Sequence, residues 1–180
     1  MNRNSALSLV KIALTIPVAY ALTYPFLHPT VAGGVLKEVM MLGWGGIMTT
    51  IGFLVLVFLY CRDLQLSLSL VSPAARQAAP RSVWLMFLFP YNFVEDFFII
   101  ANVASSLRKE SERNSKLQLF KSFGLVTGLG WCTAQIVSLL PNAVGAVAGM
   151  LALPFWIAHW VLIRRVNASL AAGNETNPAS

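Results

Sequence analysis

Four long apolar stretches constrain this chain more than any other feature of its sequence. Residues 39–61, 122–140 and 143–163 contain no Asp, Glu, Lys or Arg, and residues 12–28 form a shorter stretch beside Lys11. About 20 apolar residues in a helix, rising 1.5 Å per residue, cross the ~30 Å hydrocarbon core of a bilayer. No stretch alternates between apolar and polar residues as a barrel strand does. The sequence therefore predicts an all-α integral membrane protein with four transmembrane helices.

The first apolar stretch admits two interpretations. The chain starts with a basic MNRNS segment, and Ala19-Tyr20-Ala21 resembles the cleavage site of a signal peptide. Against cleavage, Pro17 lies within the stretch and three further spans follow it, so we expect a retained first span. Lys11 is expected to bury its aliphatic stem in lipid and to reach the headgroups with its amine.

Residues 84–107 are also apolar enough to cross, but the basic residues argue against a crossing. Basic residues near membrane helices stay on the cytoplasmic side. If the segment crosses, eight of the 13 Lys and Arg residues lie outside and five inside, whereas without the crossing twelve lie inside and only Lys37 lies outside. The second arrangement predicts that both termini are cytoplasmic. One membrane domain, residues 1–166, is then followed by a disordered cytoplasmic tail, residues 167–180.

The segment between the second and third spans, residues 83–113, is expected to form an amphipathic interfacial helix or a re-entrant helical hairpin. Pro90 lacks an N–H and ends any helix that begins before it. Asn92 is suited to cap the next helix, with Glu95 completing a capping box. Asp96 lies in the same first turn, where the helix dipole favours an anion. The apolar face of this helix is expected to meet lipid or to pack over the spans.

Three segments of the chain resemble a known family. They are FLVLVFLYCRDLQL at the end of the second span, VWLMFLFPYNFVEDFF in the intervening segment and VLIRRVNASL at the end of the last span. Over about residues 52–170 the chain resembles a bacterial family of small four-span membrane proteins of unknown function. The resemblance implies the same four-span plan and a location in the bacterial cytoplasmic (inner) membrane. It assigns no catalytic residue.

Few side chains within the apolar stretches can carry chemistry. Cys61 and Cys132 fall at different depths, so we expect two small apolar core residues and no disulfide. His28 and His159 lie near opposite surfaces and cannot share one haem iron, and His159 is expected in the interfacial aromatic belt. Gln135 is expected to hydrogen-bond a neighbouring helix, with a pore-lining role as the alternative. The sequence predicts no cofactor and no metal site.

Two GxxxG motifs, Gly124 to Gly128 and Gly145 to Gly149, predict close helix packing. They fall at different depths, so each is expected to meet another helix of the chain, or else a partner protein or a second copy. A basic cluster in and beyond the amphipathic segment is expected to contact anionic lipids of the inner leaflet. Its members are Arg108, Lys109, Arg113, Lys116 and Lys121.

Composition and motifs exclude several functional classes. The net charge of +6 comes from basic residues beside membrane helices, so no nucleic-acid partner is expected. The sequence contains no phosphate-binding loop, HExxH, GxSxG or kinase signature. These absences favour a non-enzymatic membrane protein.

Three functional interpretations remain. The favoured one is an assembly, scaffold or accessory subunit. The alternative is a small transporter or channel component, because intramembrane polar residues mark ion and substrate paths. The candidates for such a path are Asn92, Glu95, Asp96, Asn102 and Gln135. The third is an enzyme acting on a lipid-like substrate through Glu95 and Asp96, which point about 100° apart on a helix and are poorly placed to share a proton.

Overall fold

The chain is helical along almost its whole length. The computed structural model describes residues 3–28, 30 and 34–175, and this part of the chain contains no strand. The first three helices are α1 (Arg3–Leu27), α2 (Val35–Met41) and α3 (Trp44–Leu70). The others are the 3₁₀ helix η1 (Pro80–Phe87), α4 (Asn92–Ser111), the 3₁₀ helix η2 (Ser115–Leu119), α5 (Leu125–Val137) and α6 (Ala143–Glu175). The prediction of an all-α protein is confirmed.

Three helices are long and apolar enough to cross a membrane: Ser5–Leu27, Trp44–Leu70 and Ala143–Ala172. They contain most of the predicted spans 12–28, 39–61 and 143–163. The second begins later than predicted because the backbone of Gly43 has a φ of 54°, which interrupts the helix after α2. Most of the large apolar side chains on these helices are exposed, as expected for surfaces that face lipid.

The fourth predicted span, residues 122–140, is not confirmed as a helix of spanning length. Helix α5 has 13 residues, which corresponds to about 20 Å. It begins late because Phe123 and Gly124 both have positive φ angles, 47° and 78°. The segment from η2 to the end of α5 nevertheless runs alongside α6 in the opposite direction. Lys116, before α5, donates to the Ala172 carbonyl near the C-terminal end of α6, and Ser138, after α5, lies beside Gly149 near its N-terminal end.

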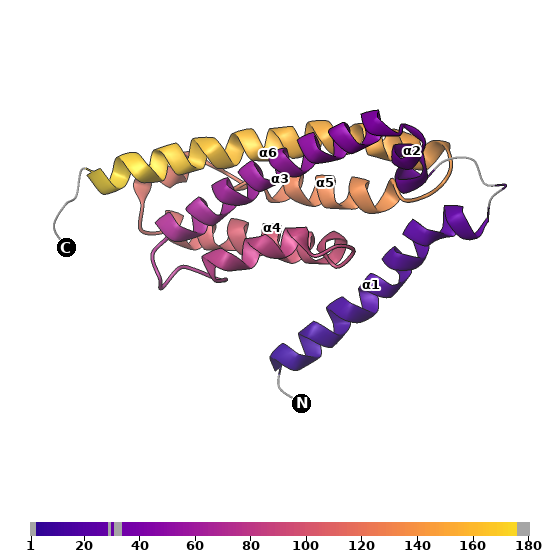
Figure 1. Cartoon of the computed structure of the whole chain (residues 1–180). Helices are drawn as coiled ribbons and strands as arrows, with labels where there is room; N and C mark the ends of the chain where they lie inside the picture. Colours follow the sequence, from indigo (N-terminus) through magenta and orange to yellow (C-terminus); the bar gives the residue numbers. More distant parts are fainter. Residues whose placement is uncertain (1–2, 29, 31–33, 176–180) are drawn as a thin grey trace.

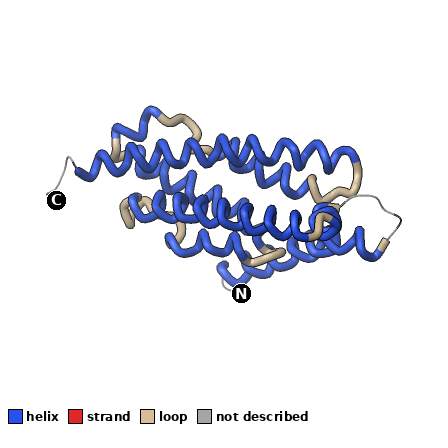
Figure 2. The backbone as a smooth tube through the Cα atoms, turned by 45° about the horizontal axis from the view of Figure 1, so that its top comes forward, coloured by secondary structure: helices blue, strands red, loops and turns tan. Residues whose placement is uncertain are grey.

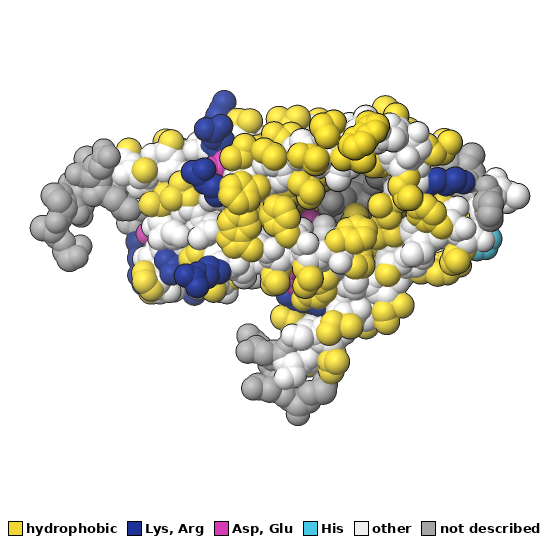
Figure 3. Space-filling view, in the orientation of Figure 1, with side chains coloured by type: hydrophobic (Ala, Val, Ile, Leu, Met, Phe, Trp, Pro, Cys, Tyr) yellow, Lys and Arg dark blue, Asp and Glu magenta, His cyan; other side chains and the backbone are white. Residues whose placement is uncertain are grey.

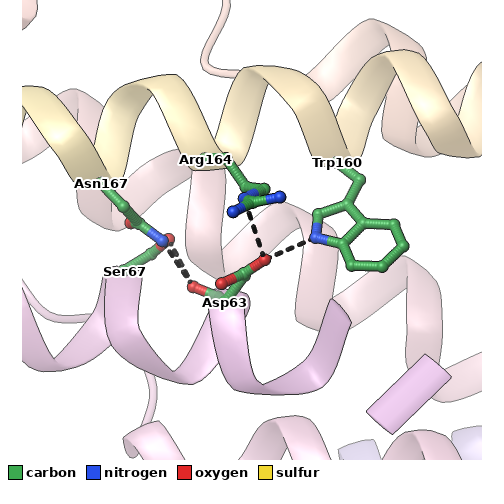
Figure 4. A network of polar contacts seen from close by, with 5 residues as sticks. All are labelled: Asp63, Ser67, Trp160, Arg164 and Asn167. Atoms are coloured by element: carbon green, nitrogen blue, oxygen red, sulfur yellow. Dashed lines mark hydrogen bonds and ion pairs between the residues drawn. The ribbon is translucent and has the colours of Figure 1, made fainter. Parts of the chain in front are cut away.

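Helices α3 and α6 lie side by side and run in the same direction (Figures 1 and 2). A polar network near their C-terminal ends joins them (Figure 4). Trp160 donates from Nε1 to Asp63 Oδ2 at 2.6 Å, and Asn167 donates from Nδ2 to the Asp63 carbonyl at 2.8 Å. Ser67 donates to Asn167 Oδ1 at 2.6 Å. Arg164 Nε lies 3.8 Å from the Asp63 carboxylate.

This network corrects the expected disordered tail, residues 167–180. Asn167 is only 5% exposed and Leu170 only 2% exposed, so α6 packs in the core beyond residue 166. The helix continues to Glu175 because these side chains have partners on α3 and in the core. Residues 176–180 lie outside the described part of the chain.

Between α3 and α5 the chain forms a helical hairpin that enters the bundle and returns. Helix η1 runs back along α3, where Trp84 Nε1 donates to Gln65 Oε1 at 2.7 Å. After a turn near Pro90, α4 runs toward the end where α3 finishes, and Glu110 there accepts from the Ser72 hydroxyl at 2.6 Å. Of the arrangements expected for residues 83–113, the structure shows the helical hairpin, and its entry into a membrane stays a prediction.

The apolar face of α4 does not face lipid. Ile100 and Leu107 are fully buried and Ala104 is 5% exposed, in a core shared with α3, α5 and α6. Hydrogen bonds hold the hairpin there, since Ser106 accepts at Oγ from the Gln77 backbone N–H at 2.9 Å. Helix α4 therefore lies inside the protein, which favours the expectation that it packs over the spans.

Helix α1 diverges from the bundle toward its N-terminal end (Figure 1). Its apolar contacts centre on Val18 and Leu22, which pack against Phe93, Val94 and Leu139. On the face seen in Figure 3, Lys and Arg side chains lie mainly over the half of the bundle nearer the C-terminus. The basic residues in the C-terminal halves of α3, α4 and α6 thus lie in the same half of the molecule.

Candidate functional site

A cavity of about 180 Å³ lies at the tip of this helical hairpin and is lined by residues of α3, η1, α4, α5 and α6. Three polar side chains line it: Asn92 and Asp96 from α4 and Gln135 from α5. The rest of the wall is apolar and largely aromatic. The structure therefore brings together three of the five residues predicted as path candidates, although they come from two separate helices.

Four polar groups at this cavity lack partners in the described part of the chain. Asn92 Oδ1, Asp96 Oδ1 and Gln135 Oε1 are buried acceptors without a hydrogen bond, and Trp156 Nε1 is a buried donor without one. Most buried polar groups are hydrogen-bonded, because burying one unpaired is costly. Several unpaired groups on one cavity indicate a place where water or a polar ligand binds.

The expected capping box at the start of α4 is wrong. The residue that precedes the helix is Tyr91 and not Asn92, and the backbone of Tyr91 is itself helical. No side chain forms a capping hydrogen bond at this end. Backbone carbonyl groups in the turn before the helix accept from its first N–H groups instead. The Asn92 N–H donates to the Leu88 carbonyl at 2.8 Å, and the Glu95 N–H donates to the Tyr91 carbonyl at 3.0 Å. The Asn92 side chain is thereby left to line the cavity.

Glu95 points away from the cavity and forms an ion pair with α1. Lys11 Nζ lies 2.7 Å from Glu95 Oε2, and the two side chains are only 13% and 6% exposed. The same ammonium group lies 4.2 Å from the centroid of the Phe98 ring. The expectation that Lys11 reaches the headgroups is therefore wrong, since its charge is neutralised inside the protein.

Asp96 has no such cation. It is 2% exposed, lies on α4 outside the three candidate spans, and has no ion pair in the described residues. Burial, and secondarily the charge of Glu95, raise the pKa of Asp96 well above its usual range. A raised pKa favours the neutral form of the carboxyl group, and a cation bound beside it would favour the ionised form.

Asn102 and Gln135 differ from expectation in opposite ways. Asn102 lies on α4 beyond the cavity and does not line it. Gln135 does line it, but its Oε1 makes no bond to a neighbouring helix, which contradicts the expected interhelical hydrogen bond. The alternative of a cavity-lining Gln135 fits the structure.

The sequence did not reveal the aromatic part of the site. Tyr60 is 0% exposed, and its hydroxyl group is hydrogen-bonded to His159 Nδ1 at 2.8 Å. Its ring makes T-shaped, edge-to-face contacts with the rings of Trp131 and Trp156. His159 is 1% exposed, so its expected place in an interfacial belt is wrong. The sequence shows aromatic residues within the apolar stretches. Their spacing alone does not show that residues from different helices face the same cavity.

The cysteines agree with the sequence, since Cys61 and Cys132 are free and fully buried. Among the described residues no group of three or more His, Cys, Asp or Glu side chains could hold a metal ion. The basic residues Arg108, Lys109, Arg113, Lys116 and Lys121 are exposed at one end of the bundle. Their expected role in lipid contacts stays a prediction.

The first glycine motif allows close packing within the chain. A Cβ on Gly128 would lie 2.5 Å from Ile100 on α4 and 2.9 Å from the His159 ring on α6. A Cβ on Gly124 would lie 2.7 Å from the same ring. In the second motif, Gly145 faces the Leu140 carbonyl in the turn between α5 and α6, and Gly149 has ordinary contacts.

The fold and the cavity together define a helical bundle that contains helices of membrane-spanning length and has a cavity lined by aromatic and polar side chains. No family model, curated protein or solved structure matches the chain. The resemblance to a bacterial small-membrane-protein family therefore stays a prediction.

Proposed function

We propose that the protein is a small transporter or channel component that binds a polar solute in the cavity at the hairpin tip. The observation that carries this proposal is the convergence of three buried, unpaired acceptors, from Asn92, Asp96 and Gln135, on one cavity. A structural role alone would favour pairing these groups or replacing them with apolar side chains.

The position of the cavity supports the proposal. The cavity lies beside Phe53 and Val57, within the apolar part of α3, and not at the end of the bundle. Broken or re-entrant helices in membrane proteins occur where the backbone is buried in protein or lines a path. Carboxylates at such places are candidate functional groups by default.

The proposed setting is the bacterial cytoplasmic membrane, with both termini and the basic end of the bundle on the cytoplasmic side. The concentration of Arg and Lys at one end supports this orientation. The exposed residues of that end then contact anionic lipid headgroups, each contributing about 1 kcal/mol.

Proteoliposomes containing a pH-sensitive dye and a voltage-sensitive dye test the proposal. Inorganic cations, organic cations, neutral polar solutes and anions are added in turn. We expect one class to change internal pH or membrane potential with the native protein and not with Asp96→Asn. The matched control is Asn102→Ala, on the same helix but away from the cavity, which should behave as the native protein does.

The outcomes separate cleanly. A response to any one class that requires Asp96 supports the proposal. Equal responses from the native protein, Asp96→Asn and protein-free liposomes to every class would overturn it, provided that circular dichroism shows both proteins folded.

The assembly, scaffold or accessory role expected from the sequence is the second candidate. The observation that favours it is an apolar groove of about 580 Å³ between α1, α4 and α5, lined by Pro17, Val18, Phe97 and Ile136 among others. A helix from a second copy would fill this groove. We expect Leu14→Cys to form disulfide-linked dimers in membranes, whereas Val161→Cys, equally exposed on α6, should not. Equal cross-linking of both would count against this role.

A further inference from the structure

The cavity at the hairpin tip has an aromatic wall contributed by three helices. Phe53 on α3 and Trp156 on α6 have ring centroids 5.8 Å apart, and Trp131 on α5 lies 6.3 Å from Trp156. Tyr60 completes the group with its centroid 5.7 Å from Trp156. Faces of aromatic rings attract cations, and Trp is the strongest of the three ring types.

The polar part of the wall has the complementary chemistry. Its unpaired oxygens come from one carboxyl group, on Asp96, and two amides, on Asn92 and Gln135. Among the described residues that line the cavity there is no Lys, Arg or His. Such a wall accepts hydrogen bonds and stabilises positive charge. The unpaired donor, Trp156 Nε1, suits a hydroxyl group on the same ligand.

The size of the cavity limits the ligand. About 180 Å³ corresponds to about six water molecules at ~30 Å³ each. A bare inorganic cation would leave most of this space to water, since only three of the described side chains offer it unpaired oxygens and hard cations take about six or more oxygen ligands. An ammonium group with a few carbon substituents fills the space and meets both kinds of wall.

We infer that the cavity binds a small organic ammonium ion, with Asp96 as its counter-ion and the rings of Phe53, Trp131 and Trp156 as its cation–π wall. This inference rests on the proposed transport function and names the class of its solute. It identifies the solute by charge and shape.

Binding of such a cation is linked to a proton on Asp96. Burial raises the pKa of that carboxyl group and so favours its protonated form, whereas a bound ammonium ion favours the ionised form. Other titratable groups near Asp96 are Tyr60 and Cys61 on α3, Cys132 on α5 and Glu95 on α4. Glu95 is itself paired with Lys11 of α1, and His159 of α6 is bonded to Tyr60. Below the pKa of Asp96, cation binding therefore releases a proton.

Calorimetric titration of the detergent-solubilised protein tests the inference with choline and with 3,3-dimethyl-1-butanol, which has the same shape without the charge. We expect choline to bind and the neutral analogue not to bind. Asp96→Asn should weaken choline binding at least tenfold, while Asn102→Ala leaves it unchanged. Choline binding should strengthen with rising pH, by up to about tenfold per unit below the pKa of Asp96.

A second variant keeps the test decisive if Asp96→Asn fails to fold. Phe53 is 42% exposed, so Phe53→Leu removes its ring at small cost to the fold. It should weaken choline binding by roughly two- to fivefold, the loss of one cation–π contact. Unchanged affinity in Phe53→Leu together with equal binding of the neutral analogue would overturn the inference.

The result also distinguishes this inference from the proposed function. If proteoliposomes respond through Asp96 to an inorganic cation, a neutral solute or an anion, and choline does not bind, then the inference fails and the transport proposal stands. If no class of solute gives a response that depends on Asp96 and choline does not bind, then both fail.

Discussion

Glu95 and Asp96 are neighbours in the sequence, yet they meet different surroundings. Adjacent side chains on a helix point about 100° apart, so one faces α1 and the other faces the cavity. Glu95 has a cation at 2.7 Å, whereas Asp96 has an oxygen with no partner in the described chain. One carboxylate is therefore explained by structure, and the other requires a ligand or a proton.

The Lys11–Glu95 ion pair is expected to contribute to the stability of the fold. Because both side chains are largely buried, Lys11→Met or Glu95→Gln alone leaves one charge unpaired, at a cost of up to about 3–5 kcal/mol. The double variant removes both charges and should be more stable than either single variant. Thermal unfolding in detergent measures the order.

Lys109→Met, at an exposed position, is the matched control for this cycle and should change the unfolding temperature little. If both single variants unfold at the temperature of Lys109→Met, then the Lys11–Glu95 ion pair does not hold α1 against the hairpin.

The sequence could show that Asn92, Asp96 and Gln135 are polar residues in apolar surroundings, but not their environment. A local pattern placed Asn92 at a helix cap, and the preceding turn supplied those hydrogen bonds instead. Lys11 and Glu95 are 84 positions apart, and no local pattern predicts that they meet. The candidate residues were thus accessible from the sequence, and the cavity was not.

At the scale of elements, the charge-free runs predicted α1, α3 and α6, because the length and apolarity that a bilayer requires are visible in the sequence. The short α5 was not predicted, since its late start depends on positive φ angles at Phe123 and Gly124. The continuation of α6 was missed because Asn167 appears polar and is in fact held by Ser67 and Asp63.

Helices α4, α5 and α6 approach closely at Gly128, and a substitution there is expected to lower stability. Gly128→Ala places a methyl group 2.5 Å from Ile100 Cγ2, and overpacking of this kind costs about 1–3 kcal/mol. Ile100→Ala removes that methyl group. The double variant should therefore be more stable than the sum of the two single effects predicts, as measured by thermal unfolding.

Gly149→Ala is the control for this clash, because its added methyl group would lie at an ordinary 3.6 Å from Ser138 Cβ. It should leave stability unchanged or raise it, since Ala favours a helix by about 1 kcal/mol over Gly. Equal losses at positions 128 and 149 would show that Gly128 is not required for the close approach.

The arrangement of the helices predicts on which side of the membrane each loop lies. The hairpin η1–α4 leaves and re-enters the same end of the bundle, so single cysteines at Ser82 and Ser115 should be labelled from the same side of the membrane. A cysteine at Leu140, 47% exposed beside the α5–α6 turn, should be labelled from the other side. Labelling of intact cells with a membrane-impermeant reagent, before and after permeabilisation, measures both.

The native cysteines do not interfere with this labelling, because Cys61 and Cys132 are fully buried and the native protein serves as the blank. Access to position 115 from outside with position 82 reached only after permeabilisation would mean that residues 84–107 cross, and the re-entrant arrangement would be wrong.

The pairing of α3 with α6 imposes a delay during synthesis. Trp160 follows Asp63 by 97 positions, and Asn167 follows Ser67 by 100. A ribosome adds about 5–20 residues per second, so α3 waits on the order of 5–20 s for its partner. During that interval the Asp63 carboxylate has neither its indole nor its guanidinium partner. A ribosome that stalls before Trp160 therefore leaves Asp63 on α3 without its partners from α6.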